Sequence, residues 1–208
     1  MNYLDPSEYQ SHGLDAATPE FWITAASALM DAHCRRPTLG LGQYTERLRL
    51  ASGRNSVRLT YLPLAFEAPA TSPLVSIRAR YAQPRRGETS PAGDLAGDVA
   101  QAFSLPGAWA SLDPALVDFC AGTGELTLPL NPLGLAYNEV EITYTAGLAV
   151  IAETVKTACA QIVRNAQATP ALTVRAGSLD RMHLDYFADS LLDRDVRALL
   201  APLVATKS

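Results

Sequence analysis

The sequence predicts an α+β fold in which a small helical bundle core carries a large β-rich insertion. Three segments place apolar residues at helical spacing and predict an N-terminal, a central and a C-terminal helix. Between the first two, apolar and polar residues alternate, and prolines and glycines mark the turns. We therefore expect an N-terminal arm at 1–17, a helical core at 18–57 and 137–204, a β-rich insertion at 58–136 and a tail at 205–208.

The composition is typical of a globular protein and argues against several classes. Hydrophobic residues make up 48% and charged residues 18% of the chain, which is ordinary for a protein that buries a core. The net charge of −4 argues against a dedicated nucleic-acid binder, which carries a basic surplus. No apolar run resembles a signal peptide or approaches the ~20 apolar residues of a membrane span. We expect a soluble, intracellular protein with no membrane partner.

The N-terminal helix has a clear start and end. Thr18 is expected as the N-cap, Pro19 at the first helical position and Glu20 in the first turn. The helix should end near Arg36, because a proline follows it. Its predicted packed face is Trp22, Ile23, Ala26, Leu29, Met30 and His33.

From Tyr44 the pattern changes to alternation and predicts a β-hairpin. Residues 45–50 and 57–61 are the expected strands, and residues 52–55 are the turn between them. Four arginines would share the solvated face of this hairpin, and a phosphate-binding patch is the alternative that we keep open; they are Arg47, Arg49, Arg54 and Arg58. A third strand is expected at 74–81, followed by a loop at 82–98 that contains Arg85 and Arg86.

Residues Asp118 to Gly124 allow two interpretations. The run Leu116-Val117-Asp118-Phe119-Cys120-Ala121-Gly122-Thr123-Gly124 resembles the first motif of S-adenosylmethionine-dependent methyltransferases, where a strand leads into a glycine turn and a helix. Here the next residues alternate like a strand and include Pro129 and Pro132, where that helix should run. We favour a hairpin of residues 117–120 and 125–128, and keep the methyltransferase as the alternative function.

The clearest strand and helix of the chain follow one another between residues 137 and 168. Val140, Ile142 and Tyr144 alternate with polar residues, and Gly147 ends the run. Apolar residues then recur at three and four positions, as on the buried face of a helix: Val155, Ala158, Cys159, Ile162, Val163 and Ala166.

The C-terminal part predicts short extended segments and a capped helix. Residues 173–175 and 182–187 read as extended, and Asp193 is a plausible N-cap for a helix at 196–200 that Pro202 ends. The aspartates of this region lack the spacing of a calcium loop. The three cysteines, Cys34, Cys120 and Cys159, are odd in number and widely spaced, which favours free thiols over disulfides. We expect no metal, no cofactor and no catalytic residue.

Two parts of the chain together resemble the head-tail connector (neck adaptor) proteins of tailed phages. They are the strand-glycine-helix unit from Val140 to Cys159 and the ending Leu192-Asp193-Arg194-Asp195-Val196-Arg197-Ala198-Leu199-Leu200-Ala201-Pro202. The helix from Pro19 to Arg36, followed by Tyr44-Thr45-Glu46-Arg47, fits the same plan. The resemblance covers about residues 18–65 and 137–204.

The resemblance implies a structural virion protein rather than an enzyme. Such an adaptor binds the portal protein as a dodecameric ring of copies of itself, extends the DNA channel and offers a platform for a stopper or tail-completion protein. DNA would pass without sequence-specific binding. The protein would be in the host cytoplasm during assembly and then in the virion neck, at the head-tail interface.

The same resemblance suggests two groups of site residues. Family members often hold the portal with the C-terminal region, which here gives the docking candidates Leu199, Leu200, Pro202, Leu203 and Val204. An acidic lining would let DNA slide by repelling phosphates. The candidates for that lining lie on the polar faces of predicted strands: Glu46, Glu139 and Glu141.

Overall fold

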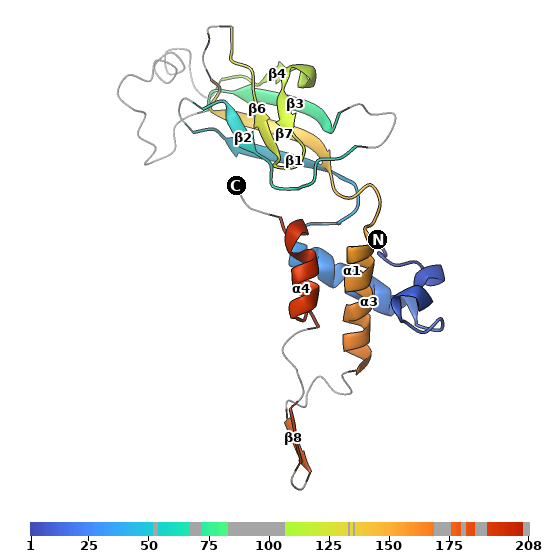
Figure 1. The fold of residues 1–208 in the computed structure, drawn as a ribbon. Coiled ribbons are helices and arrows are strands. Elements are labelled where there is room, and N and C mark those ends of the chain that lie inside the picture. The colour runs from blue at the N-terminus through green and yellow to red at the C-terminus, as the bar shows by residue number, and fades with distance from the viewer. Residues whose placement is uncertain are drawn as a thin grey trace. The chain divides into compact units, whose positions relative to one another are not determined.

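The chain folds into two compact units. The helical unit consists of Met1–Gly40 and Val150–Ala205, and the sheet unit of Leu41–Ala149 (Figure 1). The computed structural model describes residues 1–51, 54–66, 72–82, 107–132, 134, 136–168, 176–179, 182–185 and 191–205. The predicted loop pair Arg85 and Arg86 and the extended segment 173–175 lie outside these residues.

In the described part of the helical unit, three α-helices form the framework. They are α1 (Glu20–Cys34), α3 (Glu153–Ala168) and α4 (Arg194–Leu200). Helix α1 packs against α3, and α3 packs against α4. Short 3₁₀ helices lie at Pro6–Glu8, Gln10–His12 and Ala201–Leu203, and strands β8 (Ala176–Leu179) and β9 (Met182–Asp185) pair with each other. The predicted stripe of α3 is confirmed, since Val155, Cys159 and Ile162 are buried.

The ends of the helices differ in how well the sequence predicted them. Asp193 caps α4 as expected, because its Oδ1 accepts a hydrogen bond of 2.8 Å from the backbone N–H of Val196. Thr18 is not the N-cap of α1. Pro19 holds that position in an extended conformation, and its carbonyl accepts the first bond, from the N–H of Trp22 at 3.1 Å.

Residues 1–17, expected as an arm, pack on the helical unit. Tyr3, Leu4, Tyr9 and Leu14 are buried. The Tyr3 hydroxyl donates to Asp31 on α1 and accepts from the backbone N–H of Leu39 at 2.7 Å. The polar residues of this segment therefore flank a set of buried aromatic and leucine side chains.

The described residues of the sheet unit form two antiparallel sheets. The four-stranded sheet has the order β1 (Gly42–Arg49), β7 (Glu139–Ala146), β3 (Leu74–Arg80), β4 (Ala110–Leu112), and the three-stranded sheet has the order β2 (Ser56–Arg58), β6 (Glu125–Thr127), β5 (Asp118–Cys120). A 3₁₀ turn at Pro114–Leu116 precedes β5. Both sheets contribute to one apolar core, in which Ile77, Leu126, Val140, Ile142 and Tyr144 are almost fully buried.

The predicted fold class, a helical bundle core with a β-rich insertion, is wrong. Strands β1 and β7 fall in the segments assigned to the helical core, yet they pair over their full length, from Gly42 opposite Ala146 to Arg49 opposite Glu139. Their alternating apolar faces are buried in the sheet unit, together with side chains of β3 and β6. The described chain is therefore sheet-rich, with few helices.

The predicted hairpin of residues 45–50 and 57–61 is also wrong. Strand β1 pairs with β7, and β2 pairs with β6, so the two sequence neighbours belong to different sheets. The local alternation predicted the strands, but it did not predict which strands they pair with. Strand β3, by contrast, lies where the alternation at 74–81 predicts it.

Candidate functional site

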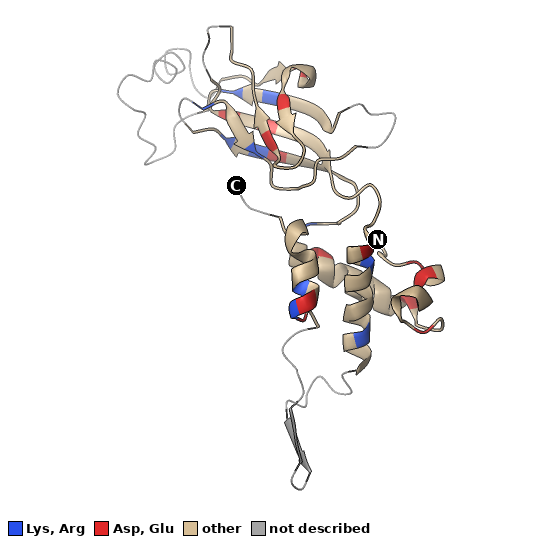
Figure 2. Cartoon of the chain, viewed as in Figure 1, with Lys and Arg blue, Asp and Glu red and all other residues tan. Residues whose placement is uncertain are grey.

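Two rows of charged side chains run across the strands on the outer face of the four-stranded sheet, and each row has a glutamate between two arginines. In one row Glu139 of β7 lies between Arg49 of β1 and Arg80 of β3. In the other row Glu141 of β7 lies between Arg47 of β1 and Arg78 of β3. Figure 2 shows these strands with basic segments on β1 and β3. The register of the sheet thus gives each glutamate of the central strand an arginine on both sides.

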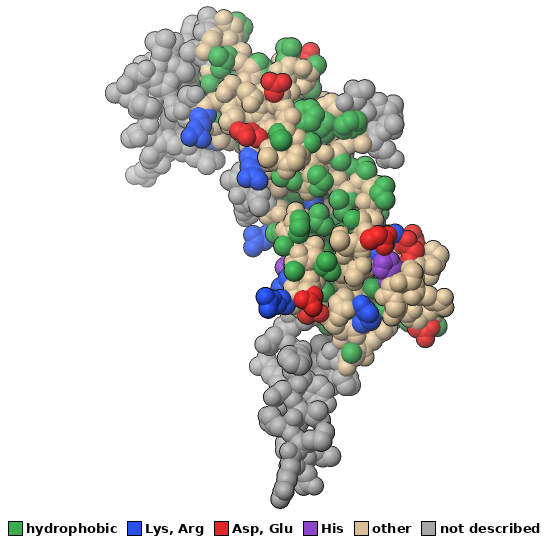
Figure 3. Space-filling view, in the orientation of Figure 1, with side chains coloured by type: hydrophobic (Ala, Val, Ile, Leu, Met, Phe, Trp, Pro, Cys, Tyr) green, Lys and Arg blue, Asp and Glu red, His purple; other side chains and the backbone are tan. Residues whose placement is uncertain are grey.

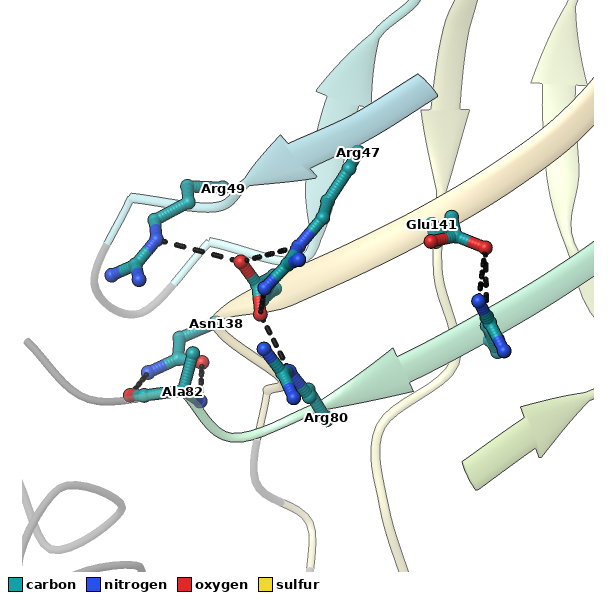
Figure 4. A network of polar contacts seen from close by, with 8 residues as sticks. Arg47, Arg49, Arg80, Ala82, Asn138 and Glu141 are labelled. Carbon is teal, nitrogen blue, oxygen red and sulfur yellow. Dashed lines mark hydrogen bonds and ion pairs between the residues drawn. The ribbon is translucent and has the colours of Figure 1, made fainter. Parts of the chain in front are cut away.

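Glu139 is the centre of this arrangement. Its carboxylate accepts hydrogen bonds from Arg47 Nε at 2.9 Å, from Arg47 Nη2 at 3.0 Å and from Arg80 Nε at 2.6 Å. Arg49 Nε lies 3.7 Å from the same carboxylate (Figure 4). The Glu139 side chain is only 4% exposed, so its charge is satisfied by these arginines rather than by water.

The arginines also determine the protonation of Glu139. Burial opposes ionisation of the carboxyl group, but the hydrogen bonds from Arg47 and Arg80 outweigh it and lower the pKa of Glu139. The same hydrogen bond raises the pKa of Arg47. Glu139 is therefore a carboxylate over the whole physiological pH range, and it holds three guanidinium groups together.

An indole ring lies under three of the arginines. The guanidinium carbons of Arg80, Arg78 and Arg47 are 4.5, 5.1 and 5.4 Å from the centroid of Trp109. All three distances are within the range of cation–π attraction. Trp109 directly precedes β4, and its ring contacts arginines of both rows on this face.

A cavity opens beside the first row, around the connection from β1 to β2. Its volume is about 750 Å³. Among the described residues, its charged lining groups are four arginines and Glu139, and the complete lining is Arg47, Leu48, Arg49, Ala51, Arg54, Ser56, Val57, Arg58 and Glu139. The four arginines that the sequence singled out thus converge on one concave site, although the hairpin expected to carry them does not form.

The three predicted channel-lining carboxylates do not share a face. Glu139 and Glu141 lie on the arginine-bearing face, whereas Glu46 is opposite Ile142 and points towards the core side of the sheet. There Glu46 accepts a hydrogen bond from Thr60 Oγ1 at 2.8 Å and another from the Tyr144 hydroxyl. Glu141 binds Arg78 Nη2 at 2.6 Å. Glu139 and Glu141 are thus paired with arginines, whereas Glu46 accepts hydrogen bonds from hydroxyl groups, and a channel-lining role for the three stays a prediction.

The predicted docking residues divide into buried and accessible side chains. Leu200 is completely buried and is a core residue of the helical unit. Pro202 is exposed, and Leu199, Leu203 and Val204 are half-buried. The backbone after them is anchored, because the N–H of Ala205 donates to the carbonyl of Cys34 at 2.9 Å. Docking by the four accessible residues stays a prediction.

Residues Asp118 to Gly124 form a hairpin. Strand β5 pairs with β6 in the register Asp118 to Thr127 and Cys120 to Glu125, and the turn is closed by a 2.8 Å bond from the N–H of Gly124 to the carbonyl of Cys120. The favoured interpretation of this segment is therefore confirmed. No helix follows the glycine turn, so this geometry does not favour the methyltransferase alternative.

The cysteines, the possible metal ligands and the helices of the described part of the chain bear on the other predictions from the sequence. The cysteines are free, with Cys34 and Cys159 buried and Cys120 exposed on β5. No group of His, Cys, Asp and Glu side chains in the described ranges could hold a metal ion. No described helix has the length and apolar character needed to cross a membrane. In comparisons with known proteins, neither a protein-family model nor a curated protein matches this chain.

Proposed function

We propose that this chain is a head-tail connector adaptor of a tailed phage, a structural virion protein. In this proposal copies of the chain bind the portal protein as a ring, extend the DNA channel and provide the platform for a stopper or tail-completion protein. The protein is made in the host cytoplasm and ends at the virion neck.

The observation that carries the proposal is the packing of the chain's two ends. Helices α1 and α3 lie more than a hundred residues apart in the sequence, yet α1 packs on α3, and α3 packs on α4. Ser27 Oγ of α1 lies 3.9 Å from Cys159 Sγ of α3, and Asn165 Nδ2 of α3 donates to Asp193 Oδ2 at 2.9 Å. The helical parts of the resembling segments thus pack together in one folded unit, whereas the strands β1 and β7 of those segments belong to the sheet unit.

Exposed apolar side chains support assembly with other subunits. Phe21 of α1 is 61% exposed, and Leu116 and Phe119 near β5 are 69% and 40% exposed. Figure 3 shows hydrophobic side chains on the visible surface of both units. A ring subunit needs two different apolar surfaces, because each copy contacts one neighbour on each side in a head-to-tail interface.

The proposal is tested by binding to the portal protein of the same genome. We expect the purified chain to co-sediment with the portal, and Leu203→Asp or Val204→Asp to weaken this binding at least tenfold, because a charge would enter an apolar contact. Val75→Asp is the matched control, since Val75 is an exposed apolar residue of β3 in the sheet unit. Wild-type protein that does not bind the portal, or a control as defective as the two variants with all melting temperatures unchanged, would contradict the proposal.

A further inference from the structure

We propose that the arginine-lined cavity between β1 and β2 binds the phosphodiester backbone of duplex DNA. This goes beyond the adaptor function, because an adaptor could form a channel without binding what passes through it. The inference concerns the free protein and can be tested without a portal, so the two proposals can fail separately.

The charge of the cavity is the first argument. Four arginines and one glutamate line it, so it is strongly positive within a chain whose net charge is −4. Arg54 and Arg58 are exposed, and the Arg47 side chain is 51% exposed. A concave surface with an excess of one sign of charge concentrates the field and attracts groups of the opposite sign. The chain's acidity as a whole therefore does not prevent an anion from binding here.

The type of cation is the second argument. All four basic side chains are arginines, whose planar guanidinium groups present several donors in a fixed geometry that matches phosphate oxygens. Arg47 uses Nε and Nη2 for Glu139, and half of its side chain still faces solvent. Glu139 and Trp109 hold Arg47 in place, so little side-chain freedom is lost when a phosphate binds.

The size of the site favours a backbone over a single small anion. A volume of about 750 Å³ lies within the range of pockets that hold drug-sized molecules, which is more room than one inorganic anion needs. The arginines come from three successive parts of the chain: Arg47 and Arg49 from β1, Arg54 from the connection and Arg58 from β2. A row of separate cations suits a chain of phosphates, because each phosphate contact adds to the binding without reading the base sequence.

The test is fluorescence anisotropy of a labelled random-sequence duplex of about 20 base pairs. We expect the binding to weaken as the salt concentration rises. A plot of the logarithm of the association constant against the logarithm of the salt concentration should have a slope of about −3, which corresponds to about three neutralised phosphates. The double variant Arg54→Gln/Arg58→Gln should move the slope about 2 units towards zero and lower the affinity at low salt at least tenfold.

The matched control removes the same number of charges elsewhere. Arg164→Gln/Arg197→Gln changes two exposed arginines of α3 and α4 and should bind DNA like the wild type. Arg58 Nε donates to the carbonyl of Thr123 at 3.0 Å, so substitution of Arg58 could also lower stability. If the double variant melts early, Arg54→Gln alone is used, and its expected change in slope is about 1 unit.

Three results would overturn the proposal. One is a control double variant that loses as much affinity and slope as Arg54→Gln/Arg58→Gln. Another is binding of inorganic phosphate, seen as a rise in melting temperature, without binding of the duplex, which would assign the cavity to small anions. The third is absence of DNA binding together with self-association that Arg54→Gln/Arg58→Gln abolishes, which would assign the arginines to a contact with a second copy.

Discussion

At the scale of single residues, two glutamates on one strand have different roles. Glu139 and Glu141 each lie between two arginines, but the side chain of Glu139 is 4% exposed and that of Glu141 is 22% exposed. Removing one member of a buried ion pair leaves the partner's charge uncompensated, whereas an exposed pair is compensated by water. The same substitution should therefore have different costs at the two positions.

We expect Glu139→Gln to lower the free energy of unfolding by about 2–3 kcal/mol, below the ~3–5 kcal/mol of a fully buried pair because Arg47 is half exposed. Glu141→Gln, with the same chemical change two residues away, should cost at most about 1 kcal/mol. Urea unfolding of the full chain measures both values. Equal costs would mean that the burial of Glu139 has no energetic consequence.

The lowered pKa of Glu139 gives a second prediction. A carboxyl whose pKa is lower in the folded protein stabilises the fold above its ordinary pKa of 4.5, and this contribution is lost as the pH falls through the lowered value. The stability difference between wild type and Glu139→Gln should therefore be largest near neutral pH and shrink below about pH 4.5. Unfolding curves from about pH 7 to about pH 3 test this. A difference that grows on acidification would contradict the assignment.

At the scale of elements, the turn between β5 and β6 depends on one of its two glycines. Gly124 has φ = +68°, where a side chain is strained, and a Cβ there would collide with the side chain of Leu62. Gly122 has open space around it. We expect Gly124→Ala to destabilise the protein by about 1–2 kcal/mol and Gly122→Ala to change stability by less than about 0.5 kcal/mol.

These two variants also test the alternative function. If the turn were a cofactor loop, S-adenosylmethionine would raise the melting temperature of the wild type, and substitution of Gly122 would remove that rise. With a hairpin, we expect no rise in either protein. Differential scanning fluorimetry with and without the cofactor distinguishes the two cases.

Helix α4 depends on its N-cap in a similar way. Asp193 accepts from the N–H of Val196 and from Asn165 of α3, so Asp193→Ala should lower the stability of α4 by about 1 kcal/mol or more. Asp195→Ala, in the first turn but not at the cap, should cost no more than about 0.5 kcal/mol. Amide hydrogen exchange of α4 measures the local opening. Equal exchange in the two variants would show that the cap does not hold the helix.

What could be predicted from the sequence depends on how local the signal is. The alternation of Val140, Ile142 and Tyr144 and the cap at Asp193 are set by neighbouring residues, and both predictions are confirmed. The partner of β1 is set by contacts with residues almost a hundred positions away, so the hairpin and the fold class were wrong.

The arginine and glutamate rows show a signal that was present but incomplete. Arg47 and Arg49, Arg78 and Arg80, and Glu139 and Glu141 are each spaced by two residues, which puts each pair on one face of its strand. A complementary pattern of this kind suggests that an acidic strand lies between two basic ones. The sequence alone did not predict the strand register, in which Glu139 is more deeply buried than Glu141.

At the scale of the whole molecule, the account links two folded units to one assembly function. The helical unit contains the helices of the segments that resemble adaptors and the accessible part of the docking segment, Leu199 and Pro202 to Val204. The sheet unit contains the arginine cavity. The adaptor proposal requires the helical unit to assemble on a portal, and the DNA-binding proposal requires only the sheet unit.

The adaptor function is tested most directly by negative-stain electron microscopy of the portal mixed with the purified chain. We expect an additional ring of density on one face of the portal, coaxial with its channel, and its loss with Leu203→Asp. Portal particles that remain unchanged at saturating concentrations of the folded wild-type chain would contradict the adaptor function.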